Sequence, residues 1–307
     1  MDKLDVDLLM ELQYRYPLVP EPYKEIAERL KTTEEDVLRR IIKLQGVIKR
    51  IGAYVSFRAV GKTSALVAAR VDDVNRVLES LRSDDDVSHC YEREHYFNLW
   101  YVIKSRNKEE LVEKVDKQLR GYEHLILYSK RTYKLSVKFD LIEGISRSPP
   151  EVLPERIPRL EGNEKFLSMI RRFPLSRRPF RDIGLSLGMN EDDVIDLLER
   201  LISIGAVRDV GAALDGDLIG FSQNCMLLIS SDEPDKVCRR IALEIPEATH
   251  VVLRETPKEW KYNCYAVFHS RDKEKAEEII SAVVSNLSLD EFLPVMSRRN
   301  LKPGVIR

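Results

Sequence analysis

Glu34-Glu35-Asp36-Val37, with the Tyr16-Pro17-Leu18 that precedes it, occurs a second time in this chain as Glu191-Asp192-Asp193-Val194 and Phe173-Pro174-Leu175. Both pairs have the same spacing, 191 − 34 = 173 − 16 = 157 residues. A fixed spacing of this kind is the signature of a repeated structural unit. The stretch therefore indicates that one fold is written twice in the 307 residues.

The spacing grows gradually toward the end of each copy. The later matches are Gly52 with Gly211, His89 with His250, Arg93 with Arg254, and Asn98 with Asn263, at offsets of 159, 161, 161 and 165. Surface loops tolerate added residues, so small insertions between matched elements are expected of a duplicated domain. We interpret the chain as an internal pseudo-dimer.

Composition excludes several classes of protein. Lysine and arginine (50) balance aspartate and glutamate (51), so the chain lacks the overall positive charge typical of a nucleic-acid binder. No apolar run approaches 18 residues, and Met1-Asp2-Lys3 does not open a signal peptide. The four cysteines are widely separated, without a Cys-x-x-Cys pair, so we expect reduced thiols and no zinc or iron-sulfur site. We expect a soluble, cytoplasmic protein without membrane contact.

Each copy opens with a helical pattern. Leu8, Leu9 and Leu12, and then Ile26, Ala27 and Leu30, recur at helical spacing, and Thr33 followed by three acids opens a third helix. Val47-Ile48 and the residues after them indicate a short wing strand. This order predicts a winged helix-turn-helix.

The third helix is poorly suited to DNA in the second copy. Between Asn190 and Leu201 it carries five acids against Arg200 alone, whereas the first copy mixes Arg39, Arg40 and Lys43 with three acids. DNA phosphates would repel the acidic helix. We therefore expect these modules to serve as scaffold and dimerisation elements rather than as DNA readers.

The second module of each copy alternates strands and helices in the order βαββαβ. This order predicts a ferredoxin-like sandwich, with helices on one face of an antiparallel sheet. Ser146–Leu160 contains four prolines and reads as an extended linker. The expected fold is an α+β tandem duplication: winged helix-turn-helix domains at 1–60 and 161–218, ferredoxin-like domains at 61–145 and 219–307, and a linker at 146–160.

The middle hairpin of each ferredoxin-like module gathers unusual side chains. Val87–Trp100 holds two histidines, an arginine, an asparagine and several aromatics, and period two puts His89, Tyr91, Arg93 and His95 on one face. The second copy has His250, Arg254, Trp260, Tyr262, Asn263 and His269 in the matching region. Arginine in such a position favours a carboxylate or phosphate, and the aromatics suit either a core or a flat ligand. For His124 we expect a structural role.

Both copies end on a Ser-basic-basic-x-x-Lys pattern, in 129–134 and 297–302. A single surface lysine is usually only solvated. The repetition of this pattern in both copies favours anion binding by Arg131, Lys134, Arg299 and Lys302.

Two resemblances follow from these residues. Leu4-Asp5-Val6-Asp7-Leu8-Leu9 and Gly46-Val47-Ile48 resemble the Lrp/AsnC regulators, in which two ferredoxin-like sheets pair face to face. Ser88–His95, with Asn98-Leu99-Trp100, and the second-copy hairpin resemble the two subunits of the siroheme decarboxylases, paired Lrp/AsnC-like proteins of the alternative haem pathway and, through relatives, of d-type haem synthesis. The chain would then be a fused heterodimer with its ligand between the sheets.

The second resemblance implies conversion of siroheme to 12,18-didecarboxysiroheme by loss of two acetate carboxylates, with no cofactor required. Siroheme is a flat, carboxylate-rimmed iron macrocycle, which suits aromatics, cations and an axial histidine, His89 or His250. Other haem-pathway enzymes are the implied partners, beside further homo-oligomerisation. The candidate catalytic residues are His89, His95, His250 and Tyr262; the candidate substrate-binding residues are Tyr91, Arg93, Tyr96, Asn98, Trp100, Arg131, Lys134, Arg254, Trp260, Asn263, His269, Arg299 and Lys302.

The two halves depart from one another. Phe97 stands where the family tends to have tyrosine, and Thr256–Lys261 is an insertion that leaves His95 without a counterpart. We therefore expect unequal halves, one supplying the catalyst or iron ligand and the other completing the pocket. Two alternatives stay open: a ligand-sensing Lrp/AsnC-type transcription regulator, and a noncatalytic tetrapyrrole-binding protein.

Overall fold

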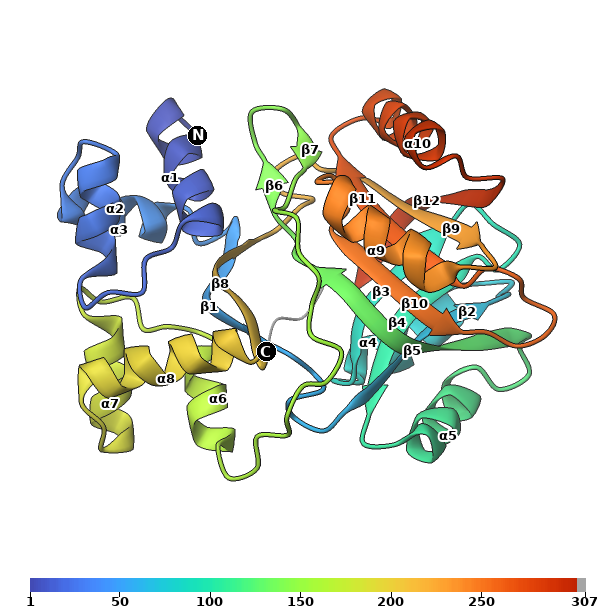
Figure 1. The fold of residues 1–307 in the computed structure, drawn as a ribbon, viewed down its shortest axis with the longest axis horizontal. Helices are drawn as coiled ribbons and strands as arrows, with labels where there is room; N and C mark the ends of the chain where they lie inside the picture. The colour runs from blue at the N-terminus through green and yellow to red at the C-terminus, as the bar shows by residue number, and fades with distance from the viewer. Residues whose placement is uncertain (303–307) are drawn as a thin grey trace. The chain divides into compact units, whose positions relative to one another are not determined.

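A computed structural model describes residues 1–302 (Figure 1). The chain forms two compact units, and each is built from both sequence copies. Unit 1 comprises residues 1–60, 136–144 and 156–220, and unit 2 comprises 61–135, 145–155 and 221 onward. Each unit is therefore a pairing of corresponding modules.

Unit 1 holds the two winged helix-turn-helix modules. The first consists of α1 (Lys3–Tyr14), α2 (Pro22–Arg29), α3 (Glu34–Lys43) and β1 (Ile48–Val55), and the second of α6 (Glu164–Ile170), α7 (Pro179–Leu187), α8 (Glu191–Ser203) and β8 (Val207–Leu214). The expected cap at Thr33 is present, because its side chain accepts from Asp36 N–H, and Asn190 caps α8 in the same way by accepting from Asp193 N–H. The short strand β6 (Phe139–Asp140) belongs to this unit and is held by the buried side chain of Gln13.

The wings join the two modules. Strands β1 and β8 pair antiparallel, with Gly52 opposite Gly211, which are matched positions of the repeat. A Cβ on Gly52 would lie 2.3 Å from the carbonyl oxygen of Arg171, and one on Gly211 would lie 2.6 Å from that of Leu12. Glycine is required at both because each wing is crossed closely by the backbone of the other copy's first helix region.

Unit 2 holds the two ferredoxin-like modules. The first contains β2 (Thr63–Ala69), α4 (Asn75–Ser83), β3 (Val87–Arg93), β4 (Leu99–Ser105), α5 (Lys108–Gln118) and β5 (His124–Leu135). The second contains β9 (Gln223–Ser230), α9 (Pro234–Glu244), β10 (His250–Glu255), β11 (Cys264–Ser270), α10 (Lys273–Leu287) and β12 (Glu291–Lys302). The spatial orders β5-β2-β4-β3 and β12-β9-β11-β10 are the same, so the expected fold class is confirmed.

The two sheets join at their edges. β5 pairs with β10 and β12 pairs with β3, which closes eight antiparallel strands into a ring. The expectation of sheets related only face to face was incomplete, because the last strand of each copy is twelve residues long and reaches the second strand of the other. Closure leaves no unpaired edge among these eight strands.

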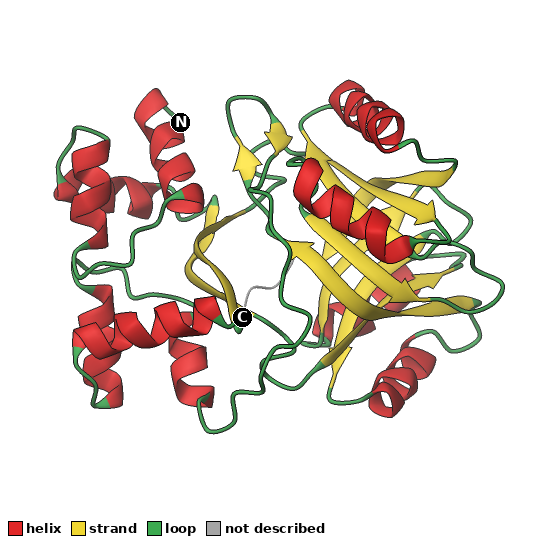
Figure 2. Ribbon diagram, viewed as in Figure 1, coloured by secondary structure: helices red, strands yellow, loops and turns green. Residues whose placement is uncertain are grey.

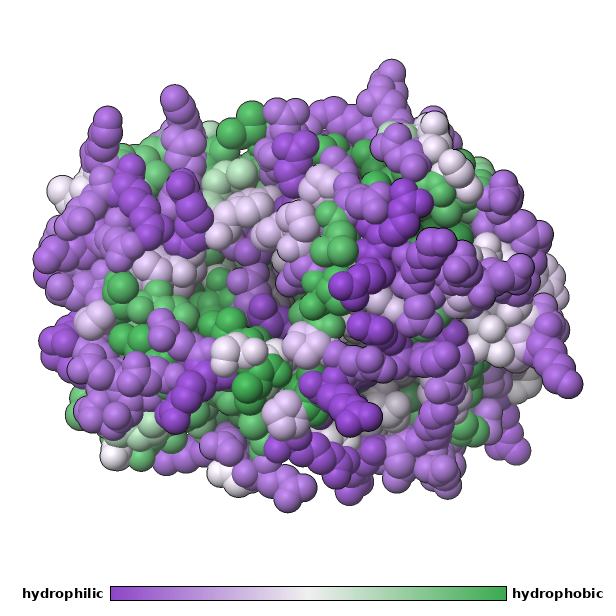
Figure 3. All heavy atoms as spheres, viewed as in Figure 1, coloured by the Kyte–Doolittle hydropathy of each residue, from purple (hydrophilic) through white to green (hydrophobic). Residues whose placement is uncertain are grey.

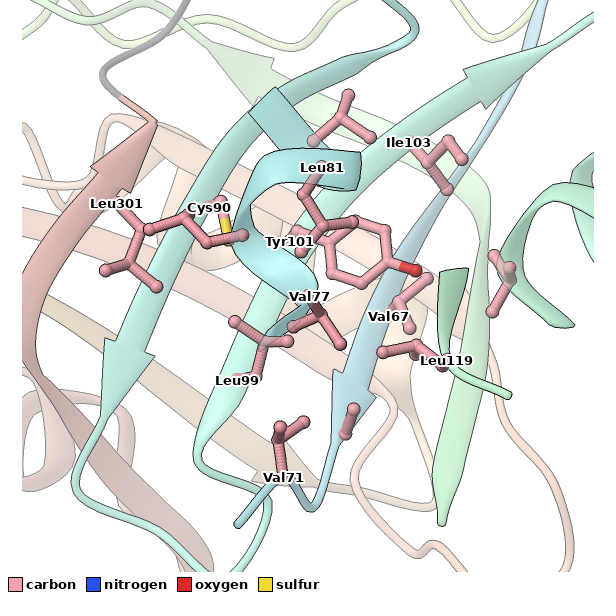
Figure 4. Close-up of a cluster of buried hydrophobic side chains, with 14 of the residues drawn as sticks. Val67, Val71, Val77, Leu81, Cys90, Leu99, Tyr101, Ile103, Leu119 and Leu301 are labelled. Atoms are coloured by element: carbon pink, nitrogen blue, oxygen red, sulfur yellow. The ribbon is translucent and has the colours of Figure 1, made fainter. Parts of the chain in front are cut away.

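Helices of unit 2 pack on its strands (Figure 2), and the buried apolar side chains of this unit form three clusters. One lies between the first sheet and α4 and α5, and includes Leu81, Leu99 and Tyr101 (Figure 4). A second lies between the second sheet and α9 and α10. The third, which includes Trp100 and Tyr265, takes side chains from both sheets and occupies the space between them. The expected ligand space between the sheets therefore contains apolar core.

The proline-rich segment packs on unit 2 at its start. It begins in β7 (Ile145–Ser146), which pairs with β11, and continues with Ser148 N–H donating to the Pro246 carbonyl and Leu153 N–H to the Tyr133 carbonyl. It contains no helix.

One cysteine expectation was wrong. Cys238 on α9 and Cys264 on β11 form a disulfide, whereas Cys90 and Cys225 are buried free thiols. Packing of α9 on β11 brings the two Cα atoms to 5.9 Å although 26 residues separate them in sequence.

Hydrophilic side chains dominate the visible surface, with smaller apolar areas between them (Figure 3). Among residues 1–302, no helix combines the length and apolarity needed to cross a membrane.

Candidate functional site

Strand β3 presents alternate side chains to the interior of the eight-stranded ring. Val87 and Cys90 belong to the core under the helices. The cross-strand neighbours of His89 and Tyr91 on β4 are Val102 and Trp100. Trp100 belongs to the cluster between the sheets, and Val102 packs against it. Arg93 follows on the same face, as the period of two predicts. His95 lies just beyond the strand.

Three histidines come together from three strands. The rings of His250 on β10 and His269 on β11 are 6.4 Å apart, and both Nδ1 atoms approach the hydroxyl of Thr249, at 2.9 and 3.4 Å. His89 on β3 lies close enough to His269 that a proton on His89 would disfavour one on His269. Desolvation, reinforced by the charges of Arg93 and His89, lowers the pKa of His269 to about 3.

Arg93 is held in this cluster by three hydrogen bonds through its Nη1 and Nη2 atoms. Its Nη1 donates to the carbonyls of Asn224 (3.1 Å) and Val295 (2.9 Å), and its Nη2 donates to Asn224 Oδ1 (2.5 Å). The guanidinium stacks on Tyr91 at 4.9 Å. Burial lowers the pKa of Arg93 to about 10, so the group is still a cation at neutral pH.

Arg254 repeats this arrangement in the other half. Its Nη1 donates to the Leu127 carbonyl (3.1 Å) and to Ser129 Oγ (3.2 Å), and the guanidinium lies 5.0 Å from the Tyr265 ring. Val295 and Leu127 both lie on the last strand of their copies, so the two arginines tie corresponding seams of the ring. Burial lowers the pKa of Arg254 to about 10.

The two guanidiniums share an electrostatic feature. Within residues 1–302, neither forms an ion pair with a carboxylate, and the Nε of each is buried without a hydrogen-bond partner. Carbonyl dipoles and aromatic faces offset only part of the cost of burying a cation. The arrangement therefore favours an anionic ligand with at least two carboxylates.

An aromatic cluster from both halves surrounds His95. The imidazole contacts Phe97, Trp100 and Trp260 at 5.8–6.0 Å, and its Nδ1 accepts from Phe97 N–H at 3.0 Å. Trp260 also contacts Tyr262 at 5.2 Å. Trp260, which packs on His95, belongs to the insertion Thr256–Lys261 that the first copy lacks. Burial lowers the pKa of His95.

Several sequence candidates lie elsewhere. Tyr96 is exposed and bonds to Glu123. Asn98 and Asn263 hold the backbone just after β2 and β9, at Val71 and Ser231. His124 bonds to a backbone carbonyl, as expected of a structural residue.

The repeated basic clusters are also engaged outside the histidine group. Lys302 donates to the carbonyls of Leu81 (2.8 Å) and Asp84 (2.5 Å), and Lys134 donates to those of Ser148 and Ile245 (both 3.3 Å). Lys302 thus caps the carboxyl end of α4, and Lys134 that of α9, so each lysine caps the first helix of the other copy's ferredoxin-like module. Arg131 lies on the Tyr133 ring, near Glu155 and Asp235, and Arg299 pairs with Glu92. Anion capture by these four residues stays a prediction without geometric support.

Sequence reasoning missed Asn224 and Thr249, which link the cluster. Asn224 is a buried polar residue directly before the apolar run Cys225–Ile229 of β9, and Thr249 directly precedes a candidate histidine. The first of these signals could have been noticed. The second acquires meaning only when β11 is placed beside β10.

The helix-turn-helix surface bears on the regulator alternative. On α3, Arg40 pairs with Asp2, Asp5 and Asp36, and Lys43 pairs with Asp5. These cations are neutralised within unit 1, and α8 is acidic. The two helices therefore do not present the basic pair of surfaces that a DNA reader needs.

Comparisons with known proteins agree with both modules. The AsnC-like ligand binding domain matches residues 59–134 and 218–302, and the siroheme decarboxylase NirDL-like HTH domain matches 5–48 and 168–208. A siroheme decarboxylase of Hydrogenobacter thermophilus is 27% identical over 96% of this chain and 92% of its own length. A siroheme decarboxylase NirDL subunit of Paracoccus pantotrophus is 30% identical over 91% and 89%.

A solved structure is similar over nearly the whole chain. The siroheme decarboxylase NirDL in complex with an iron-uroporphyrin III analogue has a TM-score of 0.68 and 25% identity, covering 98% of this chain and 93% of that one.

Proposed function

The chain belongs to the siroheme decarboxylase family, and we propose that it is a carboxy-lyase that removes two acetate carboxylates from siroheme to give 12,18-didecarboxysiroheme. The observation that carries this proposal within the structure is the pair of buried guanidiniums, Arg93 and Arg254, at repeat-related positions without carboxylate partners. Siroheme is rimmed by carboxylates and supplies the missing negative charge.

The reaction needs a proton donor but no electron donor. The bond between the acetate methylene carbon and its carboxylate breaks, carbon dioxide leaves, and the electron pair remains on the methylene carbon, in conjugation with the pyrrole. A proton then completes a methyl group. The neutral imidazole of His95 carries its hydrogen on Nε2, because Nδ1 accepts from Phe97 N–H, so it is one candidate donor. Tyr262, in the same aromatic cluster, is the second.

The histidine cluster has a separate role in this proposal. His89 and His250 face the same interior from corresponding strands, and one of them binds the iron of the substrate while the other assists proton transfer. The aromatic side chains Tyr91, Trp100 and Trp260 contact the macrocycle. The iron arrives with siroheme, so we propose that no further cofactor is required.

The two copies in one chain together form the strand ring. Both seams of the ring and the shared clusters use residues from the two copies, so the chain is its own pseudo-heterodimer. Enzymes that make siroheme and consume its decarboxylated product are the proposed partners in haem synthesis, and any further homo-oligomer would form outside this ring.

Mass spectrometry of the pigment tests the function. Anaerobically purified protein incubated with siroheme should yield a tetrapyrrole lighter by two carbon dioxide units. Siroheme recovered unchanged under both reducing and oxidising conditions would refute catalysis and leave the tetrapyrrole-binding alternative.

Single variants test the division of roles. We expect His89→Ala and His250→Ala to differ: loss of the iron ligand changes the visible spectrum of bound siroheme, and loss of the other histidine lowers single-turnover rate with the spectrum intact. Equal, modest effects of both would contradict the proposed division.

A further inference from the structure

The two repeat-related arginines are held in different ways. Arg93 donates from Nη1 to the Val295 carbonyl at 2.9 Å. Arg254 donates in the same way to the Leu127 carbonyl at 3.1 Å. Arg93 has in addition a partner across the end of its guanidinium, because Asn224 accepts from Nη1 through its backbone carbonyl (3.1 Å) and from Nη2 through its side-chain oxygen (2.5 Å). One residue thus holds both terminal nitrogens of Arg93.

The position that corresponds to Asn224 in the first copy is a serine. Ser64 is the second residue of β2, as Asn224 is of β9, and both strands pair with their neighbours in the same register. The side chain of serine is shorter than that of asparagine. Within residues 1–302, the hydrogen bonds of Arg254 leave from Nη1 alone. Arg254 is therefore held at one terminal nitrogen, and Arg93 at both.

The hydrogens of Arg93 that remain form one edge of the guanidinium. Of its five hydrogens, Nη1 gives two to carbonyls and Nη2 gives one to Asn224. The Nε hydrogen has no acceptor in the described part of the chain, so Oδ1 of Asn224 lies on the side of Nη2 that faces away from Nε. The Nε hydrogen and the outer Nη2 hydrogen are parallel, which is the geometry that a carboxylate accepts as a pair.

Asn224 is itself fixed on three sides. Its side chain is buried, and Oδ1 faces Arg93 because a guanidinium only donates. Its amide nitrogen lies 2.9 Å from Nε2 of His269, and its backbone N–H donates to Ser297 Oγ at 3.2 Å. The amide can therefore hold the arginine rather than follow its movements.

We propose that Asn224 is a positioning residue, which fixes Arg93 by its terminal nitrogens so that the Nε–Nη2 edge binds one carboxylate of the substrate through two hydrogen bonds. The inference rests on the proposed function for the identity of that carboxylate. A side chain that is already fixed loses less conformational freedom when it binds. Because Ser64 leaves Arg254 less fixed, the two halves bind the carboxylates of siroheme unequally, and the tighter of the two contacts is at Arg93.

Nitrogen NMR of protein labelled with ¹⁵N-arginine tests the hold on the guanidinium without substrate, because hydrogen bonds slow rotation about the Cζ–Nη2 bond. The signals of Arg93 and Arg254 are assigned by their loss in Arg93→Lys and Arg254→Lys. Rotation should be slow in Arg93 and faster in Arg254. Asn224→Ser, which copies the residue of the other half, should make Arg93 rotate as fast as Arg254.

Siroheme titrations test what the hold does for binding. Asn224→Ser should raise the Kd for siroheme about twofold to tenfold, since the guanidinium must then be immobilised on binding. Asn224→Asp keeps an acceptor for Nη2, so Arg93 should still rotate slowly. The introduced carboxylate pairs with the cation, however, and the Kd should rise by at least about 30-fold. A purely structural amide predicts the reverse order, with Asn224→Asp closer to the unmodified chain.

Gln13→Ser is the matched control, because Gln13 is also a buried amide that holds backbone, but its bonds to Leu9 and Phe139 lie within unit 1. It should leave the rotation of Arg93 and the Kd unchanged. Slow rotation of Arg93 in Asn224→Ser, or an unchanged Kd in that variant, would overturn the inference even in an active enzyme. The predicted rotation and affinities in a chain that leaves siroheme intact would instead refute decarboxylation alone.

Discussion

Replacement of Arg254 by methionine tests whether this arginine serves the stability of the fold or the binding of substrate. The change removes two hydrogen bonds from a charged donor, to Leu127 O and Ser129 Oγ, each worth about 1.5–3 kcal/mol. It also removes the desolvation cost of a buried cation, which is several kcal/mol. These terms oppose one another at similar size, so the free energy of unfolding should change by no more than about 2 kcal/mol.

Substrate binding should respond far more strongly. Loss of one partner of a buried charge pair costs about 2–5 kcal/mol, which corresponds to a Kd for siroheme raised about 30-fold to about 4000-fold. Arg254→Lys should recover little, because lysine lacks the planar pair of donors. Titration followed by the visible absorption of siroheme gives the Kd, and urea unfolding of the free protein gives stability.

Arg50→Met is the matched control, since Arg50 is also buried against a tyrosine ring and donates to two backbone carbonyls, but lies in unit 1 and is not a candidate site residue. Its Kd should stay close to that of the unmodified chain. A strongly destabilised Arg254→Met protein with unchanged affinity would show that the arginine serves only to join the strands, and would refute the electrostatic argument.

Three further outcomes are expected. Burial lowers the pKa of Lys134 to about 8, below its value in the unfolded chain, so between pH 8 and 10 the unfolded chain binds more protons than the folded one. The free energy of unfolding should therefore rise over this pH range, by on the order of 2 kcal/mol relative to Lys134→Met. Parallel pH profiles of the two proteins in urea unfolding would contradict this. Gly52→Ala should destabilise unit 1 by more than about 2 kcal/mol, because its Cβ would meet the Arg171 carbonyl, and a melting temperature equal to that of the unmodified chain would count against the close approach. Binding to duplex DNA should be weak and unspecific, as a salt titration would show, and a footprint that survives physiological salt would revive the regulator hypothesis.

The sequence by itself determined the duplicated architecture and most of the elements. The repeat, the helix start at Thr33 and the apolar periodicities are local properties of the chain, which is why the predicted module order agrees with the structure. The alternation along β3 is equally local, and it placed His89, Tyr91 and Arg93 on one face.

Only the tertiary structure decided which side chains meet. The repeated basic clusters predicted an anion site. Closure of the strand ring instead places Lys134 and Lys302 at helix ends, where they donate to backbone carbonyls. The same closure brings Asn224 from β9 between Arg93 of β3 and His269 of β11, and packing of α9 on β11 joins Cys238 to Cys264. These contacts depend on strand register and on helix packing between residues far apart in the chain, which periodicity does not specify.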